Sequence, residues 1–145
     1  MPRHTIRLNS QWLPPDAPRH PPPASYFRLP ATISLEDFQK SKPFLLQRQF
    51  HAPTGITVQT TVQLRLDIVA ARAGVAFNGQ PVLVDRHEPA QDGAANATFW
   101  FPVTSRLQAF NILLVALNPD STATPERLPA IIGAGLVIDE PAAVD

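Results

Sequence analysis

The chain of 145 residues contains no cysteine. This absence excludes a disulfide framework, a thiolate metal site and a cysteine nucleophile, although it does not identify the cellular compartment. A charge excess is also absent, because 12 Lys and Arg residues balance 12 Asp and Glu residues. Without a basic run to meet a phosphate backbone, nucleic acid is not an expected partner.

Long apolar runs are missing as well. No uninterrupted apolar run approaches the ~20 residues that a membrane-spanning helix needs. The segment 1–7 lacks the apolar core of a signal peptide. We therefore expect a soluble, cytoplasmic protein without a membrane partner.

Glycine is scarce, with six residues, whereas proline is abundant, with 17. Prolines are concentrated in residues 14–30, and the run Pro21-Pro22-Pro23 must be extended and cannot join the interior of a sheet. We interpret residues 14–30 as a proline-rich arm that wraps around the domain. A plain surface connector and a ligand for a proline-binding partner are the alternatives.

Helix signals are nearly absent. The one candidate is residues 34–39, where Ser34 can act as the N-cap, acidic residues fill the first turn and Pro43 imposes an end. One short helix does not make an α/β protein. The remaining pattern must therefore be explained by strands.

Alternation of apolar and polar residues is clearest over residues 57–69, which predicts one long strand with a buried face and a polar face. Asn78-Gly79 predicts a tight hairpin turn, residues 85–96 a polar loop, and Gly133-Ala134-Gly135 a strand irregularity such as a bulge. Further strands are expected over residues 5–8, 12–13, 44–50, 75–77, 81–84, 97–103, 111–117 and 131–138.

About eight antiparallel strands indicate an all-β sandwich that forms one domain over residues 1–145. Its core should contain the apolar positions of successive strands. We expect these to be Val58, Val62, Leu64, Leu66, Ile68, Phe77, Phe99, Phe101, Leu113, Val115 and Leu117.

Five segments with specific motifs occur along the chain. They are the Leu-Asn-x-x-Trp pattern in 4–12, the Arg-x-Phe-x-x-Pro pattern in 47–53, and the segments 76–80, 101–107 and 111–115. Their order resembles the sugar-binding-like jelly roll of the galactose-binding-domain superfamily, as found beside the catalytic barrel of family 2 glycoside hydrolases. The resemblance implies a jelly-roll β-sandwich. Within it, Thr104 is expected to cap a one-turn helix, and Asn111 to hydrogen-bond across a turn.

Two departures limit what the resemblance implies. Pro102 stands where an Asp is common, and Ala109-Phe110 stand where a Gly often precedes the Asn. Family 2 hydrolases also carry their catalytic carboxylates on a barrel for which this chain has no residues. The expectation is therefore a non-enzymatic domain.

The candidate ligand site centres on Trp100. Alternation places Phe99 and Phe101 on one face of their strand and Trp100 on the other. If the phenylalanines fill the core, the outward indole can stack on a sugar or a partner protein, unless the proline-rich arm covers it. Trp12 and Tyr26 are the other aromatic candidates. Polar side chains expected to converge with Trp100 are Asp85, Arg86, His87 and Glu88.

Catalytic and metal-binding motifs are not evident. The four histidines are scattered, no phosphate-binding loop or nucleophile elbow is present, and acidic residues in a loop are usually solvated. No cofactor is expected. A structural calcium ion held by Asp85, Glu88 and Asp92 remains an alternative.

The leading functional hypothesis is a non-catalytic binding module whose ligand is carbohydrate. The alternative is a protein-interaction or homo-oligomeric assembly domain that uses the proline-rich arm and the edge strands. A sugar site requires an aromatic platform with converging polar groups, whereas an assembly site requires a contiguous apolar patch. A small hydrolase of another type is a third option.

Overall fold

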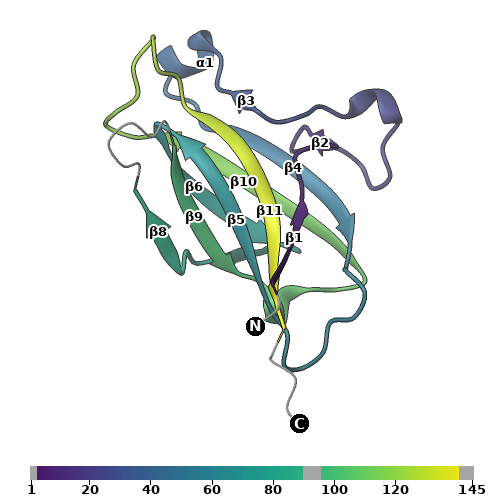
Figure 1. Cartoon of the computed structure of the whole chain (residues 1–145). Helices are drawn as coiled ribbons and strands as arrows, with labels where there is room; N and C mark the ends of the chain where they lie inside the picture. Colours follow the sequence, from purple (N-terminus) through teal and green to yellow (C-terminus); the bar gives the residue numbers. More distant parts are fainter. Residues whose placement is uncertain (1–2, 90–95, 141–145) are drawn as a thin grey trace.

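Two antiparallel sheets pack face to face in the computed structural model, which describes residues 3–89 and 96–140 (Figure 1). The six-stranded sheet has the order β1-β11-β5-β9-β8, with β3 also paired to β11, and the five-stranded sheet has the order β2-β4-β10-β6-β7. This arrangement confirms the predicted all-β sandwich. Among the described residues, no helix is long and apolar enough to cross a membrane.

The six-stranded sheet contains β1 (Arg3–Arg7), β3 (Ala31–Thr32), β5 (Thr61–Val69), β8 (Arg86–Glu88), β9 (Ala97–Pro102) and β11 (Ala130–Asp139). The five-stranded sheet contains β2 (Trp12–Leu13), β4 (Phe44–His51), β6 (Ala71–Phe77), β7 (Gln80–Val82) and β10 (Phe110–Pro119). The helices are η1 (Pro23–Ser25), α1 (Leu35–Gln39) and η2 (Thr104–Arg106).

The core lies between the two sheets and contains the predicted apolar residues, with one exception. Val58 is fully exposed, so its predicted burial is wrong. The reason is that β5 begins only at Thr61. Ahead of it the chain turns, and the Thr60 hydroxyl accepts a hydrogen bond of 3.1 Å from the Thr57 amide.

Short polar motifs form the predicted turns and caps. Ser34 caps α1 by accepting a hydrogen bond from the Asp37 amide, and a register shift between Ile131 and Gly133 marks the predicted bulge. Asn78 and Gly79 have φ angles of 53° and 82°, as the tight turn between β6 and β7 requires.

The proline-rich arm packs against the outer face of the five-stranded sheet. Gln47 lies on that face, since it alternates with the core residue Leu46, yet it is only 6% exposed. Its Nε2 donates to the Pro15 carbonyl at 3.1 Å, and Gln49 Nε2 donates to the Pro18 carbonyl at 2.9 Å. Figure 1 shows this part of the chain on the side of the sandwich where β2 and β4 lie, so these hydrogen bonds hold the arm against one side of the domain.

One charged side chain is buried at the edge of the core. Arg48 points inward at the edge of the sandwich, where its Nε donates to the Ser10 carbonyl at 2.7 Å. Desolvation by burial lowers the pKa of Arg48 from its ordinary value. An arginine keeps its proton in a protein, so Arg48 is a buried cation that needs hydrogen-bond acceptors. The Ser10 and Gln49 carbonyl groups supply them.

Candidate functional site

Trp100 lies on the outer face of the six-stranded sheet, as the alternation predicts. In the antiparallel register it is opposite Arg65 of β5 and Arg86 of β8. Side chains at directly opposite positions project from the same face, so the indole lies between two guanidinium groups. Strand β8 was not predicted, because its three residues lie in a segment that was expected to be a loop.

The indole is not an open platform, so its predicted exposure is wrong. Trp100 is only 5% exposed, because the Arg86 guanidinium lies 4.5 Å and the Arg65 guanidinium 5.5 Å from its ring centre. The indole Nε1 donates to Glu88 Oε1 at 2.7 Å. The proline-rich arm, the alternative cover, packs on the other sheet.

The other predicted site residues separate into two groups. Glu88 and Arg86 lie beside Trp100, and their side chains approach to 3.4 Å. Asp85 is next to this group and accepts a hydrogen bond of 3.1 Å from Gln63. His87 points the other way and stacks on the core residue Phe99, with ring centres 4.3 Å apart. The structure therefore brings Arg86 and Glu88 to Trp100, pairs the Asp85 side chain with Gln63, and places His87 elsewhere.

The calcium alternative gains no support from these contacts. Asp85 and Glu88 each have protein partners, and Asp92 lies outside the described residues. Within residues 3–89 and 96–140, no group of three or more His, Cys, Asp or Glu side chains could hold a metal ion.

A shallow polar hollow lies beside the Trp100 cluster on the same outer face. Gly135 of β11 is opposite both Arg7 of β1 and Arg65 of β5, so a position without a side chain lies between two arginines. The hollow has a volume of about 220 Å³ and is lined by Thr5, Arg7, Asn9, Arg65, Asp67, Ala134 and Gly135.

The sequence contains only part of the signal for this hollow. Arg65 and Asp67 fall on the polar face of the alternating segment, which is visible without a structure. The pairings that bring Arg7 and Gly135 next to them join residues 128 (135 − 7) and 70 (135 − 65) positions apart. Residue spacing carries no information about which distant strands become neighbours.

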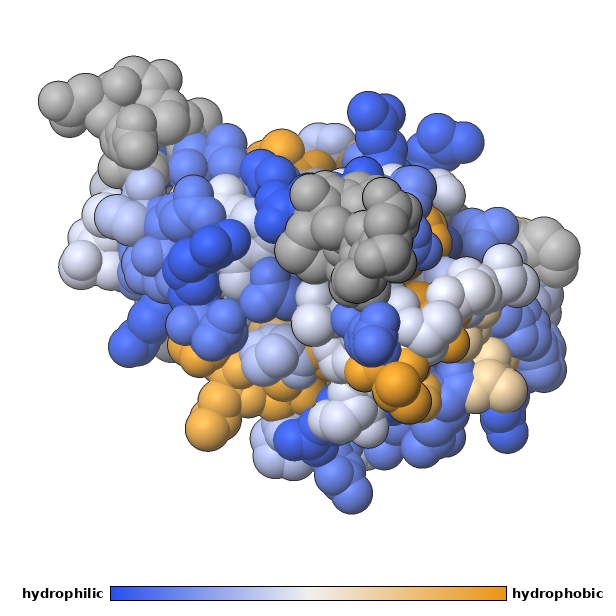
Figure 2. Space-filling model, turned by 60° about the horizontal axis from the view of Figure 1, so that its bottom comes forward, coloured by the Kyte–Doolittle hydropathy of each residue, from blue (hydrophilic) through white to orange (hydrophobic). Residues whose placement is uncertain are grey.

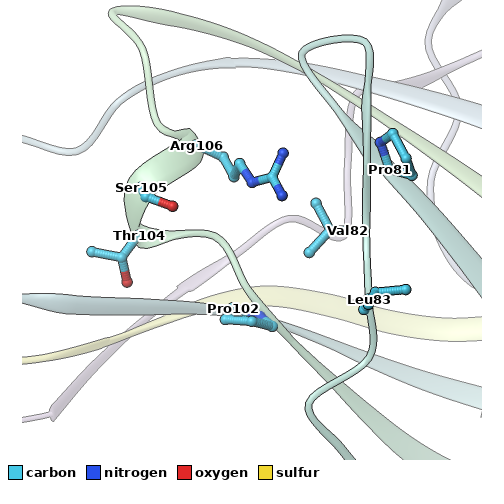
Figure 3. A pocket seen from close by; sticks show the side chains of 7 residues that line it. All are labelled: Pro81, Val82, Leu83, Pro102, Thr104, Ser105 and Arg106. Carbon is cyan, nitrogen blue, oxygen red and sulfur yellow. The ribbon is translucent and has the colours of Figure 1, made fainter.

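A larger cavity among the described residues is an open groove at the side of the sandwich, between β7 and η2 (Figure 3). It has a volume of about 680 Å³. Figure 3 shows the Arg106 side chain extending from η2 toward the strand that carries Pro81 and Val82. Next to Val82, Leu83 is 85% exposed. On the face drawn in Figure 2, apolar side chains gather in separate patches between polar ones.

Two side chains near the groove were assigned scaffold roles from the sequence. Thr104 does not cap η2, so that prediction is wrong. The N-cap is Val103, and the Thr104 hydroxyl instead accepts a 2.8 Å hydrogen bond from the Val62 amide. Asn111 does bond across its turn, since its Oδ1 accepts from the Gln108 amide at 2.8 Å.

Comparison with known proteins identifies a fold neighbour. No family model matches the sequence, and no curated protein sequence matches it significantly. Among solved structures, the crystal structure of FMN-binding beta-glucuronidase from Facaelibacterium prausnitzii L2-6 is similar, with a TM-score of 0.61 and 14% sequence identity. The match covers 95% of this chain and 23% of that chain. At this identity the likeness shows a shared β-sandwich fold alone, and the chain spans less than a quarter of that protein's length.

Proposed function

We propose that this chain is a non-catalytic module that binds carbohydrate on the outer face of its six-stranded sheet. The observation that carries the proposal is the polar hollow over Gly135, which is open and is lined by donors and an acceptor from three neighbouring strands. Sugars present hydroxyl groups that both donate and accept hydrogen bonds, so they match such a surface. On the opposite outer face, the arm covers the part around Gln47 and Gln49.

The fold likeness supports a connection with carbohydrate. The similar chain is a beta-glucuronidase, and the sandwich corresponds to about a quarter of it. The sequence motifs resemble the sugar-binding-like domain of family 2 glycoside hydrolases, where the catalytic carboxylates belong to another domain. Both observations favour a binding role for an accessory domain over an enzyme.

The carboxylates on this face are held as hydrogen-bond acceptors. Asp67 Oδ1 accepts from the Thr98 hydroxyl at 2.8 Å and from Arg65 Nε at 3.3 Å. Glu88 Oε1 accepts from the indole of Trp100. A glycosidase needs one carboxyl group as an acid and a second as a base or nucleophile across the sugar. Carboxylates fixed by arginine, hydroxyl and indole donors are better suited to positioning a ligand.

The proposal is tested by titrating isotopically labelled protein with galactosides, glucosides and plant or algal polysaccharides while recording amide chemical shifts. We expect shifts at Thr5, Arg65 and Gly135, and no shifts in the arm. A site of this openness should have a Kd between about millimolar and micromolar. No shift at any sugar concentration up to about tens of millimolar, or shifts confined to the arm, would contradict the proposal.

Self-association is the second candidate function, and the groove in Figure 3 favours it. Leu83 and Val84 are both exposed beside the groove, and exposed apolar side chains next to a cavity are typical of protein contacts. The expected occupant is a second copy of the chain. Light scattering that shows a dimer for the native protein and a monomer for Leu83→Asp would support this function. A monomer at high protein concentration would contradict it.

A further inference from the structure

Two hydrogen-bond donors in the hollow are free. Among the described residues, the Arg7 guanidinium and the Asn9 side-chain nitrogen have no partner. Asn9 is nevertheless held in place, because its Oδ1 accepts a hydrogen bond of 2.9 Å from the Ala134 amide. Its side-chain nitrogen is thereby fixed at the rim of the hollow.

The opposite wall carries both a cation and a free acceptor. Arg65 uses Nε to bind Asp67 Oδ1, which leaves its terminal nitrogens available. Asp67 Oδ1 is occupied, whereas Oδ2 has no partner among the described residues. Asp67 Oδ2 would lie 3.5 Å from a Cβ placed on Gly133, so this oxygen lies next to Gly133 of β11.

We propose that this hollow binds an acidic sugar residue. A carboxylate or sulfate group of the sugar lies between Arg7 and Arg65, and a neighbouring hydroxyl group donates to Asp67 Oδ2. This inference rests on the proposed carbohydrate-binding function and specifies its ligand class. Two arginines and one aspartate line the hollow, so it has an excess positive charge that favours an anion.

Asp67 is the reason for assigning a sugar acid instead of a simple anion. A bare anion in the hollow would be repelled by this carboxylate, whereas a ligand with a hydroxyl group next to its anionic group satisfies both kinds of partner. The volume of about 220 Å³ is below the roughly 300–1,000 Å³ of typical small-molecule pockets. It therefore suits one residue of a longer saccharide.

The fold does not otherwise explain Arg7. It lies on edge strand β1, it is exposed, and no described residue pairs with it. Gly135 does have a structural reason, since a Cβ there would lie 3.2 Å from the Ile6 carbonyl oxygen. The close approach of β1 and β11 thus favours a glycine, and the missing side chain leaves space between Arg7 and Arg65.

The experiment compares three trisaccharides by calorimetry: trigalacturonate, its neutral methyl ester, and a sulfated galactose trimer. The ester keeps the ring hydroxyls of the acid and replaces each charged carboxylate with a neutral methyl ester. We expect both acidic trimers to bind about tenfold more tightly than the ester, because charge-assisted hydrogen bonds are the stronger kind. The preference should shrink as salt is added.

Two substitutions test which side chains of the hollow contact the ligand. Arg7→Gln should weaken binding of the acidic trimers much more than binding of the ester and so remove most of the preference for acid, while Asp67→Asn should weaken the acid and the ester alike. Arg28→Gln is the matched control, because it removes the same charge from the arm, where Arg28 is exposed. It should change nothing, and thermal unfolding of each variant verifies the fold.

The outcomes separate this inference from the proposed function. Equal binding of acid and ester that survives Arg7→Gln overturns the acidic-sugar site and leaves carbohydrate binding intact. Absence of binding for all three trimers overturns both. Binding of a hexa-aspartate peptide through Arg7, without saccharide binding, assigns the hollow to protein anions and also overturns the inference.

Discussion

The two outer faces of the sandwich carry similar side chains in different surroundings. Gln47 of β4 projects from the five-stranded sheet and is buried, whereas Gln63 of β5 projects from the six-stranded sheet and is partly exposed. Phe110 has the Arg19 guanidinium 4.4 Å from its ring centre, and Trp100 has Arg86 at 4.5 Å. The difference arises because the arm supplies the cover on one face, and paired side chains of the sheet supply it on the other.

This contrast explains which face is available for a ligand. A ligand over the β4 part of the five-stranded sheet would have to displace the arm, together with the hydrogen bonds that β4 glutamines donate to its carbonyls. A ligand on the six-stranded sheet would only have to contact side chains that are already exposed to solvent. Loops and edges that stay solvated are the usual location of binding sites on rigid scaffolds.

The largest effect is expected from the core that both faces share. Leu66→Ala should destabilise the protein by about 2–5 kcal/mol, because Leu66 is fully buried between the sheets and its loss leaves a cavity. Chemical denaturation measures the change. Leu83→Ala is the control, since Leu83 is exposed and its truncation should cost less than about 0.5 kcal/mol. Equal losses for the two variants would contradict the position of the core.

The next effect separates the two faces directly. Gln47→Ala should destabilise the fold by roughly 0.5–1.5 kcal/mol, because it removes a buried side chain together with its hydrogen bond to the Pro15 carbonyl. Gln63→Ala removes a solvated hydrogen bond to Asp85 and should cost less than about 0.5 kcal/mol. A comparison of denaturant midpoints tests the pair. Similar midpoints for both variants would show that the arm does not cover the five-stranded sheet in solution.

The sequence predicts the sandwich better than it predicts this contrast. Alternation in β5 and the Asn78-Gly79 turn depend on neighbouring residues, so a local pattern is sufficient to identify them. The cover over Trp100 depends on β8, whose short run of charged residues has no apolar face and does not resemble a strand. The register of β8 with β9 decides that Arg86 lies against the indole, and register is a property of the folded sheet.

A smaller effect concerns the cover over the indole. Arg86→Ala should increase quenching of tryptophan fluorescence by acrylamide, because it uncovers Trp100 while Trp12 stays fully buried. The expected loss of stability is about 0.5–1 kcal/mol. Arg19→Ala removes the corresponding arginine from Phe110 on the other face and should leave quenching unchanged. Quenching that increases equally in both variants would mean that Arg86 does not protect the indole.

The smallest effect tests where β5 begins, since the start of this strand determines which side chains reach each face. Val58→Ser should change the free energy of unfolding by less than about 0.5 kcal/mol, because Val58 is fully exposed in the turn ahead of the strand. Val62→Ser is the matched change inside the strand, at a fully buried position. It should cost more, because it removes apolar volume and places a hydroxyl group in the core. If Val58→Ser proved as destabilising as Val62→Ser, the strand would extend to residue 57 with Val58 in the core, as the alternation alone predicts. The turn at residues 57–60 would then have to be replaced by sheet.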